Sequence, residues 1–228
     1  MKKRQRIAIY GGTFDPVHNG HLEIARRVTP LFELDEFLFL PALVAPHKQA
    51  SRVSSSLHRY AMLAIATMRD PRLAISTFEL ERPSGQYTVD TLLHFRSQLG
   101  ESTDLFFVMG ADSWVEITTW REWRRLLTLA DFIVVTRPGY QVPTGDLGLE
   151  TSFTVVDVQG QTEPLGSLPP ATEAARVFVT DVVLTDVSAT AVRQAAHEGR
   201  REELDQLVPY EVADYLRKYK LYRNSHET

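Results

Sequence analysis

The segment Ile7–Leu22, IAIYGGTFDPVHNGHL, constrains the fold of this chain more than any other part of the sequence. Its first residues, Ile7–Tyr10, form a short apolar, β-branched run that indicates a buried strand. Gly11 and Gly12 then predict a turn, because glycine tolerates positive φ and lets backbone amides approach an anion closely. A helix is expected to begin near Asn19, a good cap residue. Its first turn would present free N–H groups and the positive end of the helix dipole to a phosphate.

Two histidines, His18 and His21, stand at the expected start of this helix. They are three residues apart, so both side chains can face the same side of the first turn. They could contact a phosphate, lie at the surface or bind a metal. The chain has no cysteine and no third ligand nearby in sequence, which argues against structural zinc. The glycine spacing matches neither a dinucleotide-binding loop nor a P-loop. The histidines alone therefore do not decide among these roles.

Strand-like runs alternate with helical ones along the rest of the chain, which is the pattern of an α/β protein with a parallel sheet. The expected strands are Ile7–Tyr10, Glu36–Leu40, Leu73–Phe78, Asp104–Met109, Phe132–Thr136, a weak one at Phe153–Val158, and Val177–Leu184. The expected helices are one from near Asn19, Ser54–Met68, Thr88–Leu99, two short ones within Asp112–Ala130, and two from Ser188 to about Tyr219. We predict a Rossmann-like open parallel sheet with helices on both faces and a C-terminal helical segment.

The composition fits a single domain that spans residues 1–228. Within it, residues 139–171 are rich in Gly, Pro and Thr and predict an irregular excursion, while residues 188–222 would form the C-terminal helices. The net charge of −4 gives no reason to expect nucleic acid as a partner, and no apolar run approaches membrane-spanning length. The absence of cysteine excludes disulfides and agrees with the cytosol. We therefore expect a cytoplasmic protein without nucleic-acid or membrane partners, and leave its oligomeric state open.

Further candidate residues follow the other expected strands, because ligands of open parallel sheets bind at the carboxyl ends of the strands. These candidates are His47, Lys48, Thr88, Asp112, Trp120, Arg121 and Arg137. Each also has an ordinary structural explanation: loop cations are solvated, Thr and Asp cap helices, and tryptophans pack in cores. Taken singly, none of them fixes a function.

The string Gly12–His21, GTFDPVHNGH, resembles the signature GxFxPxHxGH of the nucleotidyltransferase superfamily. Its HxGH core is also similar to the HIGH motif of class I aminoacyl-tRNA synthetases. This resemblance implies attack on the α-phosphate of a nucleoside triphosphate with loss of pyrophosphate, without specifying the acceptor.

Later motifs resemble one branch of that superfamily, the bacterial nicotinate-nucleotide adenylyltransferases. These motifs, in the family's order, are PHK, YTVDTL, GADSW with a following TW and W, VVTRPGY, and a late STxxR-like motif. The resemblance covers about Ile7–Tyr140 and resumes over Asp186–Tyr222. It implies an enzyme of NAD biosynthesis that transfers the adenylyl group of ATP to nicotinate mononucleotide, giving nicotinate adenine dinucleotide and pyrophosphate.

The late motif departs from the family pattern ISSTxIR, because this chain has VSATAVR at residues 187–193. The valines preserve packing, but Ala189 lacks a hydroxyl that could donate to a phosphate. Ser188, Thr190 and Arg193 remain at the expected helix start. A missing donor at a charged site costs roughly 1–3 kcal/mol unless backbone amides replace it. The resemblance therefore implies a weakened triphosphate site.

The resemblance also implies roles for individual residues on the ATP side. His18 and His21 would be the catalytic residues and would donate hydrogen bonds to the phosphates, with His18 closest to the α-phosphate. The other implied contacts to ATP come from Gly12, Thr13, Phe14, Ser188, Thr190, Arg193 and, as a weaker candidate, Arg137. Mg²⁺ would arrive with ATP and be held mainly by phosphate oxygens, so no metal-binding residue is assigned.

On the mononucleotide side, Lys48 with His47 would hold the phosphate and Asp112 would accept from a ribose hydroxyl. Thr88, Trp120 and the amide of Arg121 would form the pyridine pocket, with Trp120 stacking on the ring.

Four alternatives are weighed at this stage. Nicotinamide mononucleotide differs from the acid only by an NH₂ in place of one carboxylate oxygen, and sequence does not show the backbone donors that would distinguish them. Phosphopantetheine is disfavoured by the YTVDTL and TW motifs. A non-catalytic nucleotide-binding module is favoured only by Ala189 and is opposed by the presence of both histidines. A synthetase fragment lacks support because no basic face is evident.

Overall fold

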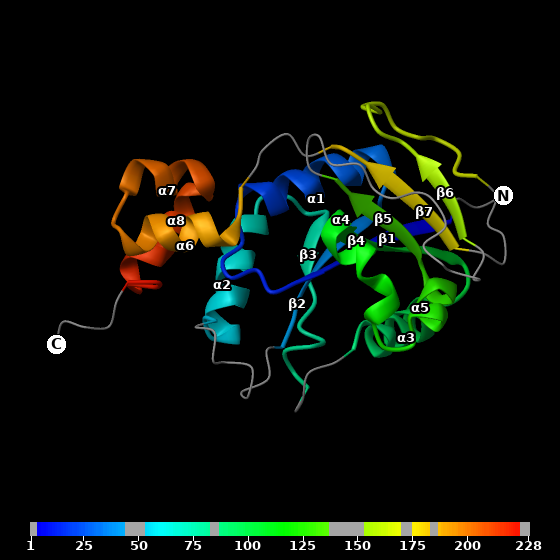
Figure 1. The fold of residues 1–228 in the computed structure, drawn as a ribbon, viewed down its shortest axis with the longest axis horizontal. Helices are drawn as coiled ribbons and strands as arrows, with labels where there is room; N and C mark the ends of the chain where they lie inside the picture. Colours follow the sequence, from blue (N-terminus) through cyan, green and yellow to red (C-terminus); the bar gives the residue numbers. More distant parts are fainter. Residues whose placement is uncertain are drawn as a thin grey trace.

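The computed structural model describes residues 4–43, 53–82, 87–136, 153–169, 175–182 and 187–223. Its centre is a seven-stranded sheet in the order β3-β2-β1-β4-β5-β7-β6, with every neighbouring pair parallel (Figure 1). The strands are β1 (Gln5–Gly12), β2 (Glu36–Pro41), β3 (Leu73–Ile75), β4 (Thr103–Gly110), β5 (Asp131–Val135), β6 (Phe153–Asp157) and β7 (Ala175–Thr180). The predicted Rossmann-like parallel sheet is therefore confirmed.

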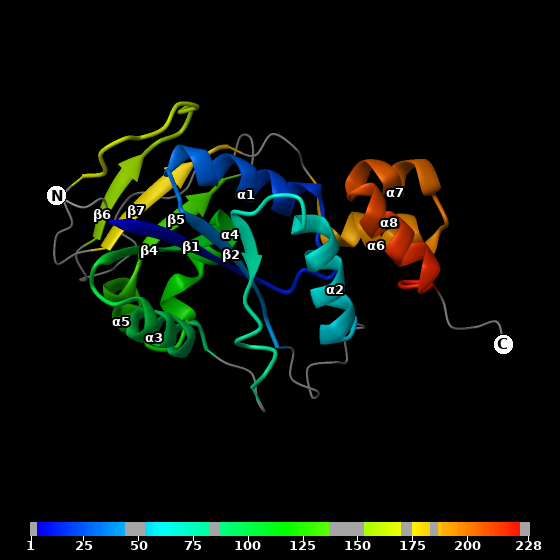
Figure 2. The same cartoon turned by 180° about the vertical axis from the view of Figure 1, so that it is seen from behind.

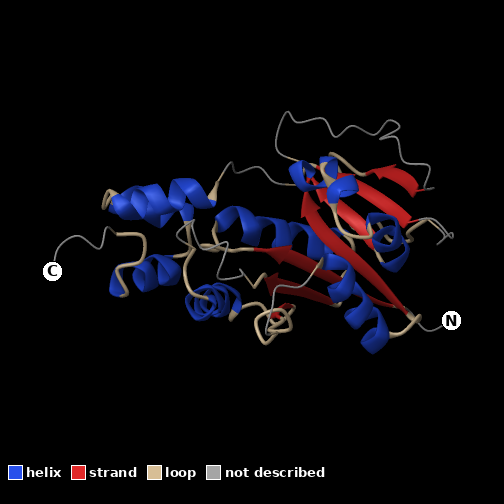
Figure 3. Cartoon of the chain, turned by 60° about the horizontal axis from the view of Figure 1, so that its bottom comes forward, coloured by secondary structure: helices blue, strands red, loops and turns tan. Residues whose placement is uncertain are grey.

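Helices cover both faces of this sheet, and Figure 3 shows the strands lying between them. The helical elements are α1 (Asn19–Leu31), α2 (Ser56–Thr67), α3 (Thr88–Leu99), α4 (Ala111–Val115), the 3₁₀ turn η2 (Ile117–Thr119), α5 (Trp123–Leu129), α6 (Ala189–His197), α7 (Arg201–Leu207) and α8 (Tyr210–Lys218). The last three form a group at one end of the molecule, far from the edge strand β6 (Figures 1 and 2). No helix among the described residues is long and apolar enough to cross a membrane.

The alternation of side chains along the central strands creates two separate cores. In β1, Ala8 and Tyr10 belong to the core under α1, α2 and the C-terminal helices, while Ile7 and Ile9 belong to the core under α3 and α5. The same division continues across β4, where Phe106 packs on the first side and the neighbouring apolar residues on the second. Strands buried on both faces need nearly continuous apolar sequences, which explains runs such as DLFFVM.

Three predictions about the elements are wrong. The third strand is shorter than Leu73–Phe78 and ends at Ile75, and the last strand ends at Thr180 rather than Leu184. The segment after Ser188 contains three helices rather than two. α7 ends at Leu207, and Pro209 occupies the N-cap of α8. Proline lacks a backbone N–H and disfavours helical conformation in the residue before it, so the break follows from the sequence. The weak strand at β6 does form, pairing with β7 at the sheet edge.

The strand order places the reversal of the sheet between β1 and β4. The chain builds outward from β1 through β2 to β3 on one side, and from β4 through β5 to β7 on the other. The connections after β1 and β4 therefore leave toward opposite faces and open a crevice at their carboxyl ends. These ends are Gly12 and Gly110.

Candidate active site

A cavity of about 300 Å³ lies at this reversal point, beyond the ends of β1 and β4. Five predicted site residues line it: Gly12, Phe14, His21, Thr88 and Trp120. The rest of its described wall is formed by Tyr10, Gly11, Leu40, Ala42, Glu79, Phe107, Met109, Gly110 and Ser113. The cavity thus gathers residues from the ends of several strands, as expected for a ligand site in an open parallel sheet.

The two glycines at the end of β1 are required for a reason different from the predicted one. Neither Gly11 nor Gly12 has positive φ, and both still belong to the strand. A Cβ on Gly11 would lie 3.2 Å from the Phe107 ring, and one on Gly12 would lie 3.0 Å from the Phe14 ring. The residue in the left-handed region is Phe14, with a φ of 48°. The glycines therefore make room for aromatic rings, and the loop turns at Phe14.

The histidines lie at the start of α1, and their rings stack with centroids 3.6 Å apart. His18, not Asn19, is the N-cap residue, so the predicted cap is displaced by one position. The His18 backbone N–H donates to His21 Nδ1 at 3.2 Å. Asn19 instead donates its side-chain amide to the Gln206 carbonyl at 2.8 Å, which ties α1 to the end of α7.

His21 is held as a neutral hydrogen-bond donor. Burial, and then the neighbouring His18, lower the pKa of His21 well below its usual value. Its Nδ1 already accepts a backbone hydrogen bond, so the single proton of the neutral ring belongs on Nε2. Phe14 packs edge-on against the ring at 5.0 Å between centroids. The cavity wall therefore offers an N–H donor whose charge does not change near neutral pH.

The start of α6 lies beside the start of α1. A Cβ on Gly20, in the first turn of α1, would lie 3.5 Å from the Val187 carbonyl just before α6. Ser188 caps α6 by accepting from the Ala191 N–H at 3.2 Å. Arg193 donates to the Asp15 carbonyl at 2.8 Å and to Thr190 Oγ1 at 3.1 Å. The predicted residues of the late motif are thus brought to the loop that follows β1.

On the other side of the cavity, Trp120 meets Phe107 edge-on, with centroids 6.3 Å apart. Arg121 places its guanidinium 4.6 Å from the centroid of the Tyr87 ring. Tyr87 is the N-cap of α3, so Thr88 is the first helical residue rather than the cap. The contact of Arg121 with Tyr87 joins the segment before α5 to the start of α3, and each of these segments also contributes a residue to the cavity wall, Trp120 and Thr88.

For four other predicted residues, the structure does not show a position in the cavity wall. Asp112 is exposed in the first turn of α4, where Gly110 rather than Asp112 is the N-cap; its neighbour Ser113 lines the cavity. His47, Lys48 and Arg137 lie outside the described residues.

Glu79 is a cavity residue that the sequence analysis did not identify. It is 8% exposed and accepts from Thr91 Oγ1 at 2.8 Å and from the Leu43 amide. Burial raises the pKa of Glu79, against the effect of these two hydrogen bonds. The available signal is a single acid between Phe78 and Leu80, upstream of the YTVDTL motif.

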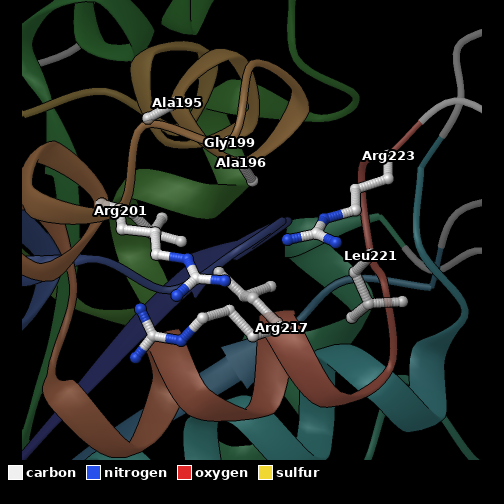
Figure 4. Close-up of a pocket in the computed structure, with 9 residues that line it drawn as sticks. Ala195, Ala196, Gly199, Arg201, Arg217, Leu221 and Arg223 are labelled. Carbon is white, nitrogen blue, oxygen red and sulfur yellow. The ribbon is translucent and has the colours of Figure 1, made fainter.

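A second, much smaller hollow lies between α6, α7 and α8, and Figure 4 shows the side chains of Arg201, Arg217 and Arg223 around it. Its volume of about 10 Å³ is close to that of a single water site. Arg217 is already paired with Asp205 at 2.6 Å and Asp214 at 2.8 Å. The cavity beyond β1 and β4 is therefore the candidate active site.

Comparison with known proteins identifies the family of the chain. The family model described as cytidylyltransferase-like matches residues 9–195. A Corynebacterium jeikeium protein named probable nicotinate-nucleotide adenylyltransferase is 37% identical over 215 residues, covering 94% of this chain and 99% of that protein. A Thermoanaerobacter sp. protein with the same name is 34% identical over 227 residues, covering 100% of this chain and 99% of that protein.

Solved structures show the same fold. The nicotinic acid mononucleotide adenylyltransferase of Plasmodium falciparum, complexed with NaAD, matches with a TM-score of 0.72 at 19% identity. The match covers 96% of this chain and 97% of that one. The same enzyme complexed with APC gives a TM-score of 0.71.

We predict that the free energy of unfolding of Glu79→Gln increases relative to that of the wild type as the pH rises. The folded state holds the Glu79 proton more tightly than the unfolded chain, whose glutamates titrate near about 4.3. The wild-type protein therefore loses stability relative to the variant as pH increases from about 4.3 through the raised pKa of Glu79. The measurement is urea unfolding of both proteins between pH 4 and 9.

The matched control is Glu81→Gln, an exposed acid two residues away. The stability difference between wild type and Glu79→Gln should change more with pH than the difference between wild type and Glu81→Gln. A Glu79→Gln difference that changes no more with pH than the Glu81→Gln difference would show that the Glu79 carboxyl ionises normally.

Proposed function

Because the chain belongs to the cytidylyltransferase-like family and, within it, to the nicotinate-nucleotide adenylyltransferases, we propose that it transfers the adenylyl group of ATP to nicotinate mononucleotide. The products are nicotinate adenine dinucleotide and pyrophosphate, and the reaction belongs to NAD biosynthesis. The observation that supports this best is the stacked His18–His21 pair, with His21 on the wall of the cavity where the sheet order reverses.

The reaction needs no nucleophile from the protein. An oxygen of the mononucleotide phosphate forms a bond to the α-phosphorus of ATP, and the bond from that phosphorus to the bridging oxygen of the β-phosphate breaks. Catalysis then consists of holding two mutually repelling anions in line and stabilising the charge on the leaving pyrophosphate. Orientation alone can supply up to about 7–11 kcal/mol.

On the ATP side, neutral His21 donates from Nε2 to a phosphate oxygen, and His18 acts nearest the α-phosphate. The remaining ATP contacts come from the loop amides of Gly12, Thr13 and Phe14, from Ser188, Thr190 and Arg193, and from Arg137. The starts of α1 and α6 add the partial positive charge of two helix ends. This arrangement supplies much of the positive potential through fixed N–H dipoles.

On the mononucleotide side, Thr88, Trp120 and the Arg121 amide bind the pyridine ring, and Asp112 accepts from the ribose. His47 and Lys48 bind the mononucleotide phosphate. Glu79 lies in the same wall, and its raised pKa favours the uncharged form that would repel a substrate carboxylate least.

When bound with ATP, Mg²⁺ would supply positive charge that offsets the phosphate charge. Among the described residues, no group of three or more His, Asp or Glu side chains is arranged to hold a metal. An ion that arrives with ATP would be held mainly by phosphate oxygens and water. We propose that residues 1–228 act as one nucleotidyltransferase domain in the cytoplasm.

The direct test measures pyrophosphate release from ATP with nicotinate mononucleotide, nicotinamide mononucleotide and phosphopantetheine in parallel. We expect the highest kcat/KM with nicotinate mononucleotide and none above background with phosphopantetheine. A higher kcat/KM with nicotinamide mononucleotide would show that this compound is the acceptor instead. Binding of ATP without pyrophosphate release for any acceptor would indicate the non-catalytic alternative.

We predict that His18→Ala lowers kcat by about 10²–10³, the usual loss when one preorganised donor to a developing charge is removed. Steady-state pyrophosphate release measures the change. His197→Ala, an exposed histidine at the end of α6, is the control and should retain wild-type turnover. If His18→Ala turned over at nearly the wild-type rate, the assignment of His18 as a donor to the α-phosphate would be wrong.

We predict that Trp120→Ala raises the KM for nicotinate mononucleotide about 5-fold to 150-fold, the equivalent of roughly 1–3 kcal/mol of lost ring stacking. The KM for ATP should change by less than about twofold. Trp123→Ala serves as the control, because Trp123 is half-buried but does not line the cavity. Equal increases in both KM values for Trp120→Ala would contradict the assignment.

A further inference from the structure

The loop from Thr13 to Asp15 is held from outside the cavity by a buried arginine. Arg59 of α2 is 1% exposed and donates to three backbone carbonyls. They belong to Thr13 at 2.7 Å, Ala42 at 2.9 Å and Ser54 at 3.2 Å. Its guanidinium therefore joins the loops after β1 and β2 to the start of α2.

This contact sets the direction of a loop amide. The Thr13–Phe14 peptide is trans and planar, so the Phe14 N–H points opposite to the Thr13 carbonyl that Arg59 binds. Phe14 itself has a φ of 48°, a conformation that a bulky residue adopts only where its surroundings enforce it. Arg59 is one group that enforces it.

Asp15, the next residue, is held by three separate segments. Its carboxylate is buried and accepts from the Tyr222 hydroxyl at 2.5 Å and from the Ser54 N–H at 3.2 Å. Its carbonyl accepts from Arg193 at 2.8 Å. The loop is thus fixed between α2, the start of α6 and the segment that follows α8.

The surroundings of Tyr222 keep its phenol protonated, so that it can donate to the Asp15 carboxylate. Burial, and then the Asp15 carboxylate, raise the pKa of the Tyr222 phenol, which therefore remains a donor across the physiological range. Burial lowers the pKa of Arg59, whereas Asp15 opposes that shift and favours the charged guanidinium. The charged groups facing Asp15 are thus Arg59 from α2 and Arg193 from α6.

We propose that Arg59, Asp15 and Tyr222 form a loop clamp: positioning residues that hold the Phe14 amide and its neighbours in the geometry that binds the ATP phosphates. The clamp makes triphosphate binding depend on the C-terminal segment, although Tyr222 does not line the cavity. This inference rests on the proposed function only in taking the loop as the triphosphate site.

The decisive variant is Tyr222→Phe, which removes one hydroxyl and keeps the ring. We expect the affinity for a non-hydrolysable ATP analogue, measured by calorimetry well below the unfolding temperature, to fall about tenfold. The KM for ATP should rise by a similar factor, while the KM for nicotinate mononucleotide changes less than about twofold. Amide hydrogen exchange at residues 12–14 should become faster.

Tyr219→Phe is the matched control. Tyr219 lies in the same segment and is 48% exposed; its ring packs against Tyr215 at 4.5 Å between centroids. Removing its hydroxyl should leave analogue affinity and loop exchange at wild-type values. Asp15→Asn provides a second variant, which keeps an acceptor for Tyr222 but loses the charge, and should also weaken analogue binding.

The clamp is overturned if Tyr222→Phe binds the analogue within about twofold of wild type, or if Tyr222→Phe and Tyr219→Phe weaken it equally. Its failure is distinguishable from failure of the proposed function. A wild-type protein that binds the analogue but does not use nicotinate mononucleotide contradicts the function alone. Normal turnover with an unaffected Tyr222→Phe variant contradicts the clamp alone.

Discussion

The burial of β1 and β4 on both faces is the constraint on which the rest of the structure depends. Each strand sends alternate side chains into two cores, so helices must cover both sides of the sheet. Covering both sides forces the connections after these neighbouring strands to diverge, and their divergence opens the cavity at Gly12 and Gly110. The site is therefore a consequence of how the apolar sequence is buried, and its polar residues occupy a space that packing has already created.

The fold and much of the candidate site could be predicted, because strand and helix periodicity and the order of the motifs are properties of local sequence. Helix α3 has its predicted limits, and five predicted residues line one cavity. What could not be predicted depends on packing between distant segments. The glycines accommodate Phe107 and Phe14 rather than supplying positive φ, and Glu79 becomes significant only because folding buries it beside Thr91. Such contacts leave no periodic signal.

The electrostatics of the site follow from its position at strand and helix ends. Among the described residues of the cavity wall, the ionisable side chains Tyr10, His21 and Glu79 all have pKa values shifted toward their neutral forms. Positive potential then comes from backbone N–H groups and helix ends, with Arg193 bound to the loop that follows β1. Fixed dipoles need no reorganisation as charge moves from the α-phosphate to pyrophosphate, which is what an adenylyl transfer requires.

The contact between Asp15 and Tyr222 spans 207 positions of the chain, and its energetics show what maintains it. One hydrogen bond to a charged group contributes about 1.5–3 kcal/mol, which is too little to order a whole C-terminal segment at about 1–2 kcal/mol per residue. The segment must be placed by apolar burial, and Val192, Val212 and Leu216 are fully buried in the core shared with α1 and α2. Because that burial already positions Tyr222, its hydrogen bond is not needed to order the C-terminal segment. The bond can instead restrain the loop that contains Asp15. The C-terminal helices thus supply apolar side chains to the core, and the segment after α8 supplies the hydroxyl that contacts Asp15.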